Sequence, residues 1–223
     1  MLQASTPKFL KDLEKNNNKP WFDAHRPAYE AARADFAGFV QQLVDQHGKK
    51  DRSISHLVAK DCLFRINRDV RFSKNKAPYK NNFGASINQR GKKAIASAGY
   101  YFHLQPGHSF AGGGIWMPEP EDLKKIRQEI DYNFKEFKQL IGTGKFKAVY
   151  GDFSHDAEYK LVRVPKGYEA DNPAAEYLKL KSHVAMIDIK DSELSSGELL
   201  KKTLAAFAAL QPLVEFINRS LEA

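Results

Sequence analysis

The stretch AGYYFHLQPGHSFAGGGIW, residues 98–116, carries the clearest signal for the fold of this chain. Two short segments rich in apolar and aromatic residues, near 98–105 and 109–116, flank Pro106-Gly107, a pair typical of a type II turn. A tight turn joins antiparallel neighbours, whereas parallel strands need a long crossover. The stretch therefore predicts a β-hairpin.

Patterns on either side of the hairpin extend this prediction to the whole chain. Short segments near 62–72 and 83–88, and the motifs YKLVRV and HVAMIDI, predict further strands. Apolar residues at three- and four-residue spacing predict helices at about 6–15, 20–47, 119–141 and from Ser195 onward, and a short one after Asn172-Pro173. Helices around a run of short strands indicate an α+β fold, with a mostly antiparallel sheet flanked by helices from both ends of the chain. Since no repeat or linker interrupts the sequence, we expect residues 1–223 to form a single α+β domain.

Composition restricts the class of protein. With 42% hydrophobic residues, the 223-residue chain can bury a sizeable core. Cys62 is its only cysteine, so an intramolecular disulfide and a cysteine-based zinc site are both excluded. The sequence has neither a secretory signal pattern nor an apolar run long enough to span a bilayer. We therefore expect a cytoplasmic protein that is not in a membrane.

The charge points to anionic partners. The formal net charge is +8 and the pI is about 9.4, which favours nucleic acid or phosphate compounds as partners. The positive charge is concentrated: from Lys60 to Lys80 there are seven Lys or Arg residues and only two acids, Asp61 and Asp69.

The segment FRINRDVRFSKNKAPYK, residues 64–80, holds most of these cations. As a strand, it would point its apolar residues to one side and most of its polar residues to the other. Like charges about 6 Å apart repel by roughly 2–3 kcal/mol at an effective dielectric constant of about 20, so two acids do not balance seven cations. Arginine also suits bidentate contact with phosphate. We therefore predict that one concave anion site collects Arg65, Arg68, Asp69, Arg71, Lys76, Tyr79 and Lys80. The alternative is a solvated sheet edge, where lysines discourage aggregation.

Other motifs carry weaker signals. Gly107 to Ala111 nearly matches the G-x-S-x-G nucleophile elbow, but the predicted hairpin lacks the helix that this motif requires, so we expect Ser109 not to be a nucleophile. The glycines at 112–114 have neither P-loop nor dinucleotide-binding spacing; they favour close strand packing, and we expect no cofactor. His103 and His108 supply at most half of a zinc shell, so no metal site is predicted. His155-Asp156 is a pair suited to acid–base chemistry.

Four motifs in order along the chain resemble an uncharacterised conserved protein family, domain-of-unknown-function family 2461. They are FLKDLEKNNNKPWF, RDVRFSKNKAPYK, GGGIWMPEPEDLKKIR and VPKGY. The resemblance runs almost from end to end and implies an α+β protein. It implies no catalytic residue, and it places Pro78 and the seven predicted site residues in the signature core of the family.

Two functions fit the sequence. The first is a binding module for an anionic, phosphate-bearing ligand, nucleic acid included. The second is an enzyme that acts on an anionic small molecule or nucleotide, with Asp69, Tyr79 or a histidine transferring the proton. A flat, extended basic surface with exposed aromatic rings would indicate nucleic acid. A concave pocket where the arginines converge with a histidine or carboxylate would indicate a small molecule.

Overall fold

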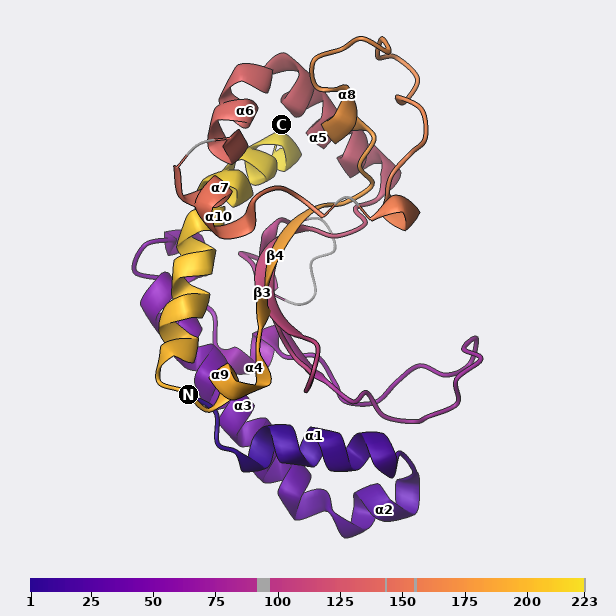
Figure 1. Ribbon diagram of the computed structural model, residues 1–223, viewed down its shortest axis with the longest axis vertical. Coiled ribbons are helices and arrows are strands. Elements are labelled where there is room, and N and C mark those ends of the chain that lie inside the picture. The colour runs from indigo at the N-terminus through magenta and orange to yellow at the C-terminus, as the bar shows by residue number, and fades with distance from the viewer. Residues whose placement is uncertain (92–96, 143, 155, 223) are drawn as a thin grey trace.

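The computed structural model describes residues 1–91, 97–142, 144–154 and 156–222, and its centre is a four-stranded sheet (Figure 1). The strands are β1 (Phe83–Ile87), β2 (Gly99–Leu104), β3 (Ser109–Ile115) and β4 (His183–Ile189). They lie in the order β1-β2-β3-β4, and each neighbouring pair is antiparallel. The predicted hairpin is confirmed: Gly107, with a φ of 84°, lies in the turn between β2 and β3.

Helices from both ends of the chain flank this sheet, as the sequence predicts. They are α1 (Ser5–Lys15), α2 (Lys19–Ala24), α3 (Arg26–His47), α4 (Ala59–Cys62), α5 (Pro120–Tyr132), α6 (Phe134–Gly142), α7 (Gly144–Tyr150), α8 (Ala175–Leu178), α9 (Asp191–Leu194) and α10 (Glu198–Glu222), with 3₁₀ turns at Arg52–Ile54 and Ala157–Tyr159. The two long helices, α3 and α10, lie on the same side of the sheet (Figure 1). The fold is therefore α+β.

Alternation along β2 assigns the two faces of the sheet. Tyr100, Phe102 and Leu104 are fully buried against the helices, where Phe102 contacts Phe39 of α3. Tyr101 and His103 point to the other face and are half-buried. We call this second face of the sheet the outer face.

The glycines of β3 allow close packing, as predicted. A Cβ added to Gly113 would collide with the carbonyl oxygen of Gly99 on β2 and would lie 2.8 Å from Leu210 of α10. At Gly112 it would collide with the carbonyl oxygen of Ala185 on β4. Any larger residue would push the neighbouring strands and α10 away.

Three predicted helices differ from expectation. The helix predicted for 20–47 is interrupted at His25, where α2 ends and α3 begins. The single helix predicted for 119–141 is interrupted at Asn133, where α5 ends and α6 begins. Asparagine is a poor helix former, and it adopts φ −111° and ψ 32° here. The last helix begins at Glu198 rather than at Ser195, and Ser196 accepts the Glu198 N–H through its Oγ at 3.0 Å.

The strand predicted for residues 62–72 is wrong. Only an isolated bridge joins Leu63 to Ala85 of β1, after which the chain leaves the sheet. Its alternating apolar residues do not share a buried face, because Phe64 is 40% exposed and Phe72 is 95% exposed. Without a continuous partner strand, the alternation stabilises no ladder.

The strand predicted for YKLVRV is also wrong, for the same reason. The segment forms one bridge, from Lys160 to Leu180, and Val162 is 93% exposed.

Among the helices of the described residues, none combines the length and the apolar character that crossing a membrane requires.

Candidate functional site

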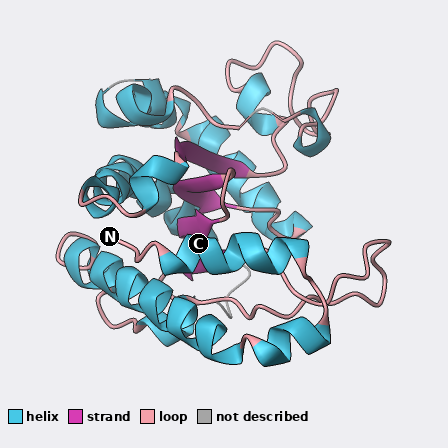
Figure 2. Ribbon diagram, turned by 60° about the horizontal axis from the view of Figure 1, so that its bottom comes forward, coloured by secondary structure: helices cyan, strands magenta, loops and turns pink. Residues whose placement is uncertain are grey.

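Residues 64–82 form a long arm that projects from the body of the molecule. Figures 1 and 2 both show it as a loop that stands clear of the helices and strands. Its two limbs pair with each other: Arg68 N–H donates to Pro78 O at 2.9 Å, and Lys80 N–H donates to Ile66 O at 2.8 Å. An isolated bridge joins Asn67 to Tyr79. The base of the arm is therefore an irregular hairpin rather than a strand of the central sheet.

The N-terminal helices fix the base of this arm. Asn17, which follows α1, donates from its side chain to Tyr79 O at 2.9 Å and accepts from Tyr79 N–H at 3.1 Å. The ring of Phe22 on α2 stacks on the ring of Tyr79, with centroids 4.0 Å apart. An amide that satisfies both backbone groups of one residue sets its position and orientation. Segments far apart in the sequence thus build one rigid corner.

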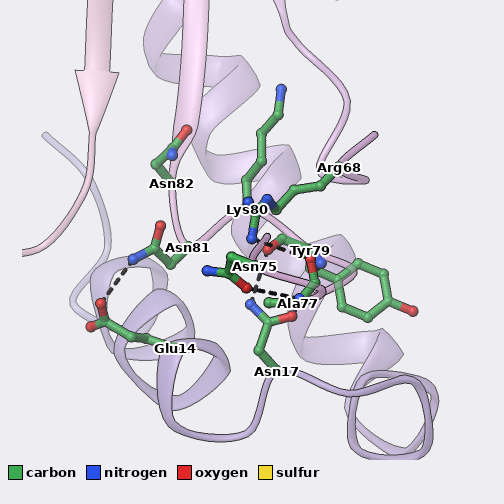
Figure 3. Close-up of a pocket in the computed structure, with 9 residues that line it drawn as sticks. All are labelled: Glu14, Asn17, Arg68, Asn75, Ala77, Tyr79, Lys80, Asn81 and Asn82. Carbon is green, nitrogen blue, oxygen red and sulfur yellow. Dashed lines mark hydrogen bonds between the residues drawn. The ribbon is translucent and has the colours of Figure 1, made fainter. Parts of the chain in front are cut away.

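A cavity of about 420 Å³ opens at this corner (Figure 3). Asparagine side chains and two cations dominate its wall, which consists of Glu14, Asn17, Arg68, Asn75, Ala77, Tyr79, Lys80, Asn81 and Asn82. Asn81 donates to the Glu14 carboxylate at 2.8 Å, and the Asn75 side chain accepts from Ala77 N–H at 2.9 Å. The wall is thus rich in hydrogen-bonding groups.

Arg68 and Lys80 bring positive charge to this cavity. Arg68 donates to Ala77 O at 3.3 Å and to Ser73 Oγ at 3.4 Å, which are both neutral acceptors. Lys80 places its Nζ 5.5 Å from the centre of the Phe64 ring. Within the part of the chain that the structure describes, neither cation forms an ion pair with a carboxylate, although Glu14 shares the cavity wall.

The environment of Lys80 disfavours its charge. Burial lowers the pKa of its ammonium group below 10.5, and the nearby guanidinium of Arg65 lowers that pKa further. Arg65 itself is exposed and does not line the cavity. Partial burial and the neighbouring charge of Arg65 therefore leave Lys80 with an electrostatic penalty that a bound anion would relieve.

The remaining predicted site residues lie farther along the arm. Asp69 accepts from Arg71 at both carboxylate oxygens, with Nε–Oδ1 at 3.0 Å and Nη2–Oδ2 at 2.7 Å. Lys76 donates to Val70 O at 3.0 Å. Three of the seven residues, Arg68, Tyr79 and Lys80, thus line the cavity, whereas Arg65, Asp69, Arg71 and Lys76 do not.

The groups expected to transfer protons are poorly placed for that role. The Tyr79 ring is packed against Phe22, and its hydroxyl points away from Arg68 and Lys80 (Figure 3). The hydrogen bonds from Arg71 lower the pKa of Asp69, so this carboxylate stays ionised and occupied. No histidine is among the residues that line the cavity, and His155 lies outside the described residues.

The polar half of the cavity wall was not predicted from the sequence. Glu14 and Asn17 come from a segment about fifty residues before Arg68, and Asn75, Asn81 and Asn82 carry no charge. The available signal was the density of asparagine in NNNKP and in NKAPYKNN, two stretches that the fold brings together.

The structure also describes the surroundings of two other candidates. Ser109 lies within β3, is buried, and exchanges hydrogen bonds with the Gln105 backbone at 2.8 and 3.0 Å, so it forms no nucleophile elbow. No group of three His, Cys, Asp or Glu side chains suited to a metal ion occurs among the described residues.

Fold and site together define an α+β protein with a projecting arm and a cavity lined by cations and asparagines at the base of that arm. The chain belongs to the family described as conserved hypothetical protein (DUF2461), whose model matches residues 5–216. This match confirms the resemblance carried by the sequence motifs. The comparisons with curated proteins and with solved structures gave no match.

Proposed function

We propose that the cavity at the base of the arm binds an anionic, phosphate-bearing ligand. The observation that carries this proposal is that Arg68 and Lys80 both line the cavity and have no ion-pair partner within the described residues. Half-buried charges normally have a partner of opposite sign. An anion between these two side chains would supply that partner.

The neutral part of the wall supports the same ligand. Side-chain amides donate hydrogen bonds without adding charge, and four asparagines line the cavity. A phosphate oxygen accepts from amide, guanidinium and ammonium groups alike. The volume, about 420 Å³, lies within the range of small-molecule sites.

The alternative is an enzyme that acts on an anionic small molecule or nucleotide. Catalysis would need a proton-transfer group in the wall. Among the described residues that line it, Glu14 is the one carboxylate, and Asn81 already donates to it. The geometry therefore supports binding over catalysis. The cytoplasmic location expected from the sequence would give the cavity access to abundant phosphate compounds.

The test compares inorganic phosphate and sulfate with chloride at equal ionic strength. A ligand at a hundredfold excess over its Kd stabilises the folded state by about 2.7 kcal/mol. For a chain of this size, that corresponds to a rise in Tm of roughly 5–10 °C. We expect phosphate to raise the Tm of the wild-type protein, and Lys80→Gln to abolish the increment.

Lys74→Gln is the matched control, because it removes one charge from the same arm at an exposed position outside the cavity. It should keep the full response to phosphate. The proposal is wrong if phosphate acts no differently from chloride, or if the two variants lose the response equally.

A further inference from the structure

The arm carries two exposed phenylalanines, and each has a cation beside it. Phe72, near the tip, is 95% exposed and lies 5.7 Å from the guanidinium carbon of Arg71. Phe64, at the base, is 40% exposed and lies 5.5 Å from Lys80 Nζ. An exposed aromatic ring next to a cation combines a stacking surface with a phosphate contact. The arm therefore places an exposed aromatic ring beside a cation at both of its ends.

The aromatic surface continues from Phe64 across the outer face of the sheet. The ring of Phe64 lies 6.3 Å from that of Tyr101 on β2, which lies 5.6 Å from that of Phe110 on β3. His103 stacks on Phe110 at 4.7 Å with an interplanar angle of 12°. These rings lie opposite the face that α3 and α10 pack against. Phe64 thus joins the arm to a row of aromatic side chains on a rigid strand surface.

Charge is spread along the arm rather than gathered at one point. Arg65, Lys74 and Lys76 are exposed, and the single acid, Asp69, is held by Arg71. Nine residues from 64 to 72 reach at most roughly 30 Å. A row of cations over this length fits several phosphates in succession better than one small anion.

We propose that the arm and the adjoining outer face bind single-stranded nucleic acid. Unpaired bases would stack on Phe72 and Phe64 and continue toward Tyr101, while the phosphates between them contact the exposed cations. The inference rests on the proposed function in one respect: the cavity of Arg68 and Lys80 takes one of these phosphates. Single strands are favoured over duplex because stacking on a side chain needs an unpaired base.

An anionic lipid surface would also attract the cations, but the aromatic rings are arranged differently from a membrane anchor. An interfacial anchor inserts a continuous apolar face. Here Phe72 is the large apolar residue at the tip, whereas Phe64 lies at the opposite end of the arm and contacts the strand surface. This distribution suits bases that stack at separated points along a nucleic-acid strand.

The experiment measures binding of a labelled single-stranded oligonucleotide of about 16 nucleotides by fluorescence anisotropy, over a range of salt concentrations. Three to five phosphate contacts predict a slope of log K against log salt of about −2 to −4. Phe72→Ala should weaken binding by about fivefold or more and leave the slope unchanged. Lys74→Gln should reduce the magnitude of the slope by about 0.7.

Tyr132→Ala is the matched control, because Tyr132 is an exposed aromatic residue on α5, away from the arm. It should bind the oligonucleotide like the wild type. The proposal is overturned if Phe72→Ala binds as tightly as Tyr132→Ala, if a duplex of equal length binds as well as the single strand, or if anionic vesicles bind and the oligonucleotide does not.

The same variants separate this inference from the proposed function. If phosphate raises the Tm of both wild type and Phe72→Ala but the oligonucleotide does not bind, the nucleic-acid inference fails and the phosphate site stands. If the oligonucleotide binds in a Phe72-dependent way while phosphate gives no Tm shift, the cavity is not a phosphate site and the stacking surface stands.

Discussion

Tyr79 and Phe22 stack with their ring planes inclined by only 16°, which joins the returning limb of the arm to α2. Both rings are buried, and Asn17 holds the Tyr79 backbone from the adjacent loop. The corner that carries Arg68 and Lys80 is therefore anchored to the N-terminal helices, although the tip of the arm is exposed.

The first prediction concerns Asn17. Asn17→Ala removes two hydrogen bonds to the Tyr79 backbone and should destabilise the protein by about 1–3 kcal/mol. That corresponds to a fall in Tm of roughly 2–12 °C. Asn16→Ala is the control, because the Asn16 side chain donates to Asp12 O of the neighbouring helix α1 and, among the described residues, makes no hydrogen bond to the arm. Equal losses in the two variants, measured by calorimetry, would show that Asn17 does not anchor the arm.

Lys80 should lower the stability of the unliganded protein at neutral pH. Its folded-state pKa is below 10.5, so the folded protein releases this proton before the unfolded chain does, and stability rises with pH through that window. Lys80→Gln should therefore be at least as stable as the wild type at pH 7, and the difference should shrink as the pH rises toward 10.5. Urea unfolding from pH 7 to 11 measures both effects. A less stable Lys80→Gln at pH 7 would contradict this account.

Two buried histidines should make the fold sensitive to acid. Burial lowers the pKa of His47 to about 4, against the attraction of Asp51, and lowers that of His183 to about 4 as well. The stability of the folded state that depends on these two neutral histidines is fully present above pH 6.5. It is lost as the pH falls toward 4, because the unfolded chain takes up protons first. Each proton corresponds to about 1.4 kcal/mol per pH unit. His47→Phe should reduce the slope of the unfolding free energy against pH, between pH 4 and 6.5, by the equivalent of about one proton. An unchanged slope would exclude His47 as a source of the acid sensitivity.

Two glycines should respond to alanine in opposite ways. Gly114 has a φ of 112°, and an added Cβ would collide with the carbonyl oxygen of His183, so Gly114→Ala should cost more than the roughly 1–3 kcal/mol of backbone strain alone. Gly38 lies inside α3 with open space around it, so Gly38→Ala should stabilise the protein by about 0.5–1 kcal/mol. Thermal unfolding of the two variants tests both signs.

Local sequence determined most of the secondary structure. The Pro106-Gly107 turn and the apolar segments beside it specify β2 and β3, since a tight turn allows only antiparallel neighbours. The 3.6-residue period likewise specifies α3 and α10, because one apolar stripe has to face a core. The positive charge of the arm is also a property of composition alone.

Tertiary structure decided which of the strand-like segments pairs with a neighbour in the sheet. Alternation around Phe64 and Phe72 looks like a strand in sequence, but a ladder needs a second backbone, and beyond Leu63 the chain pairs with its own return limb instead. Tertiary contacts also divide the cations of the arm into two groups. Arg68 and Lys80 line the cavity, whereas Arg65, Lys74 and Lys76 are exposed along the arm. Backbone hydrogen bonds from Arg68 to Pro78 and from Lys80 to Ile66 bring the two cations to one wall, while Arg71 stays near the tip. Asn17 and Phe22, distant in sequence, hold Tyr79 and with it the base of the arm in place.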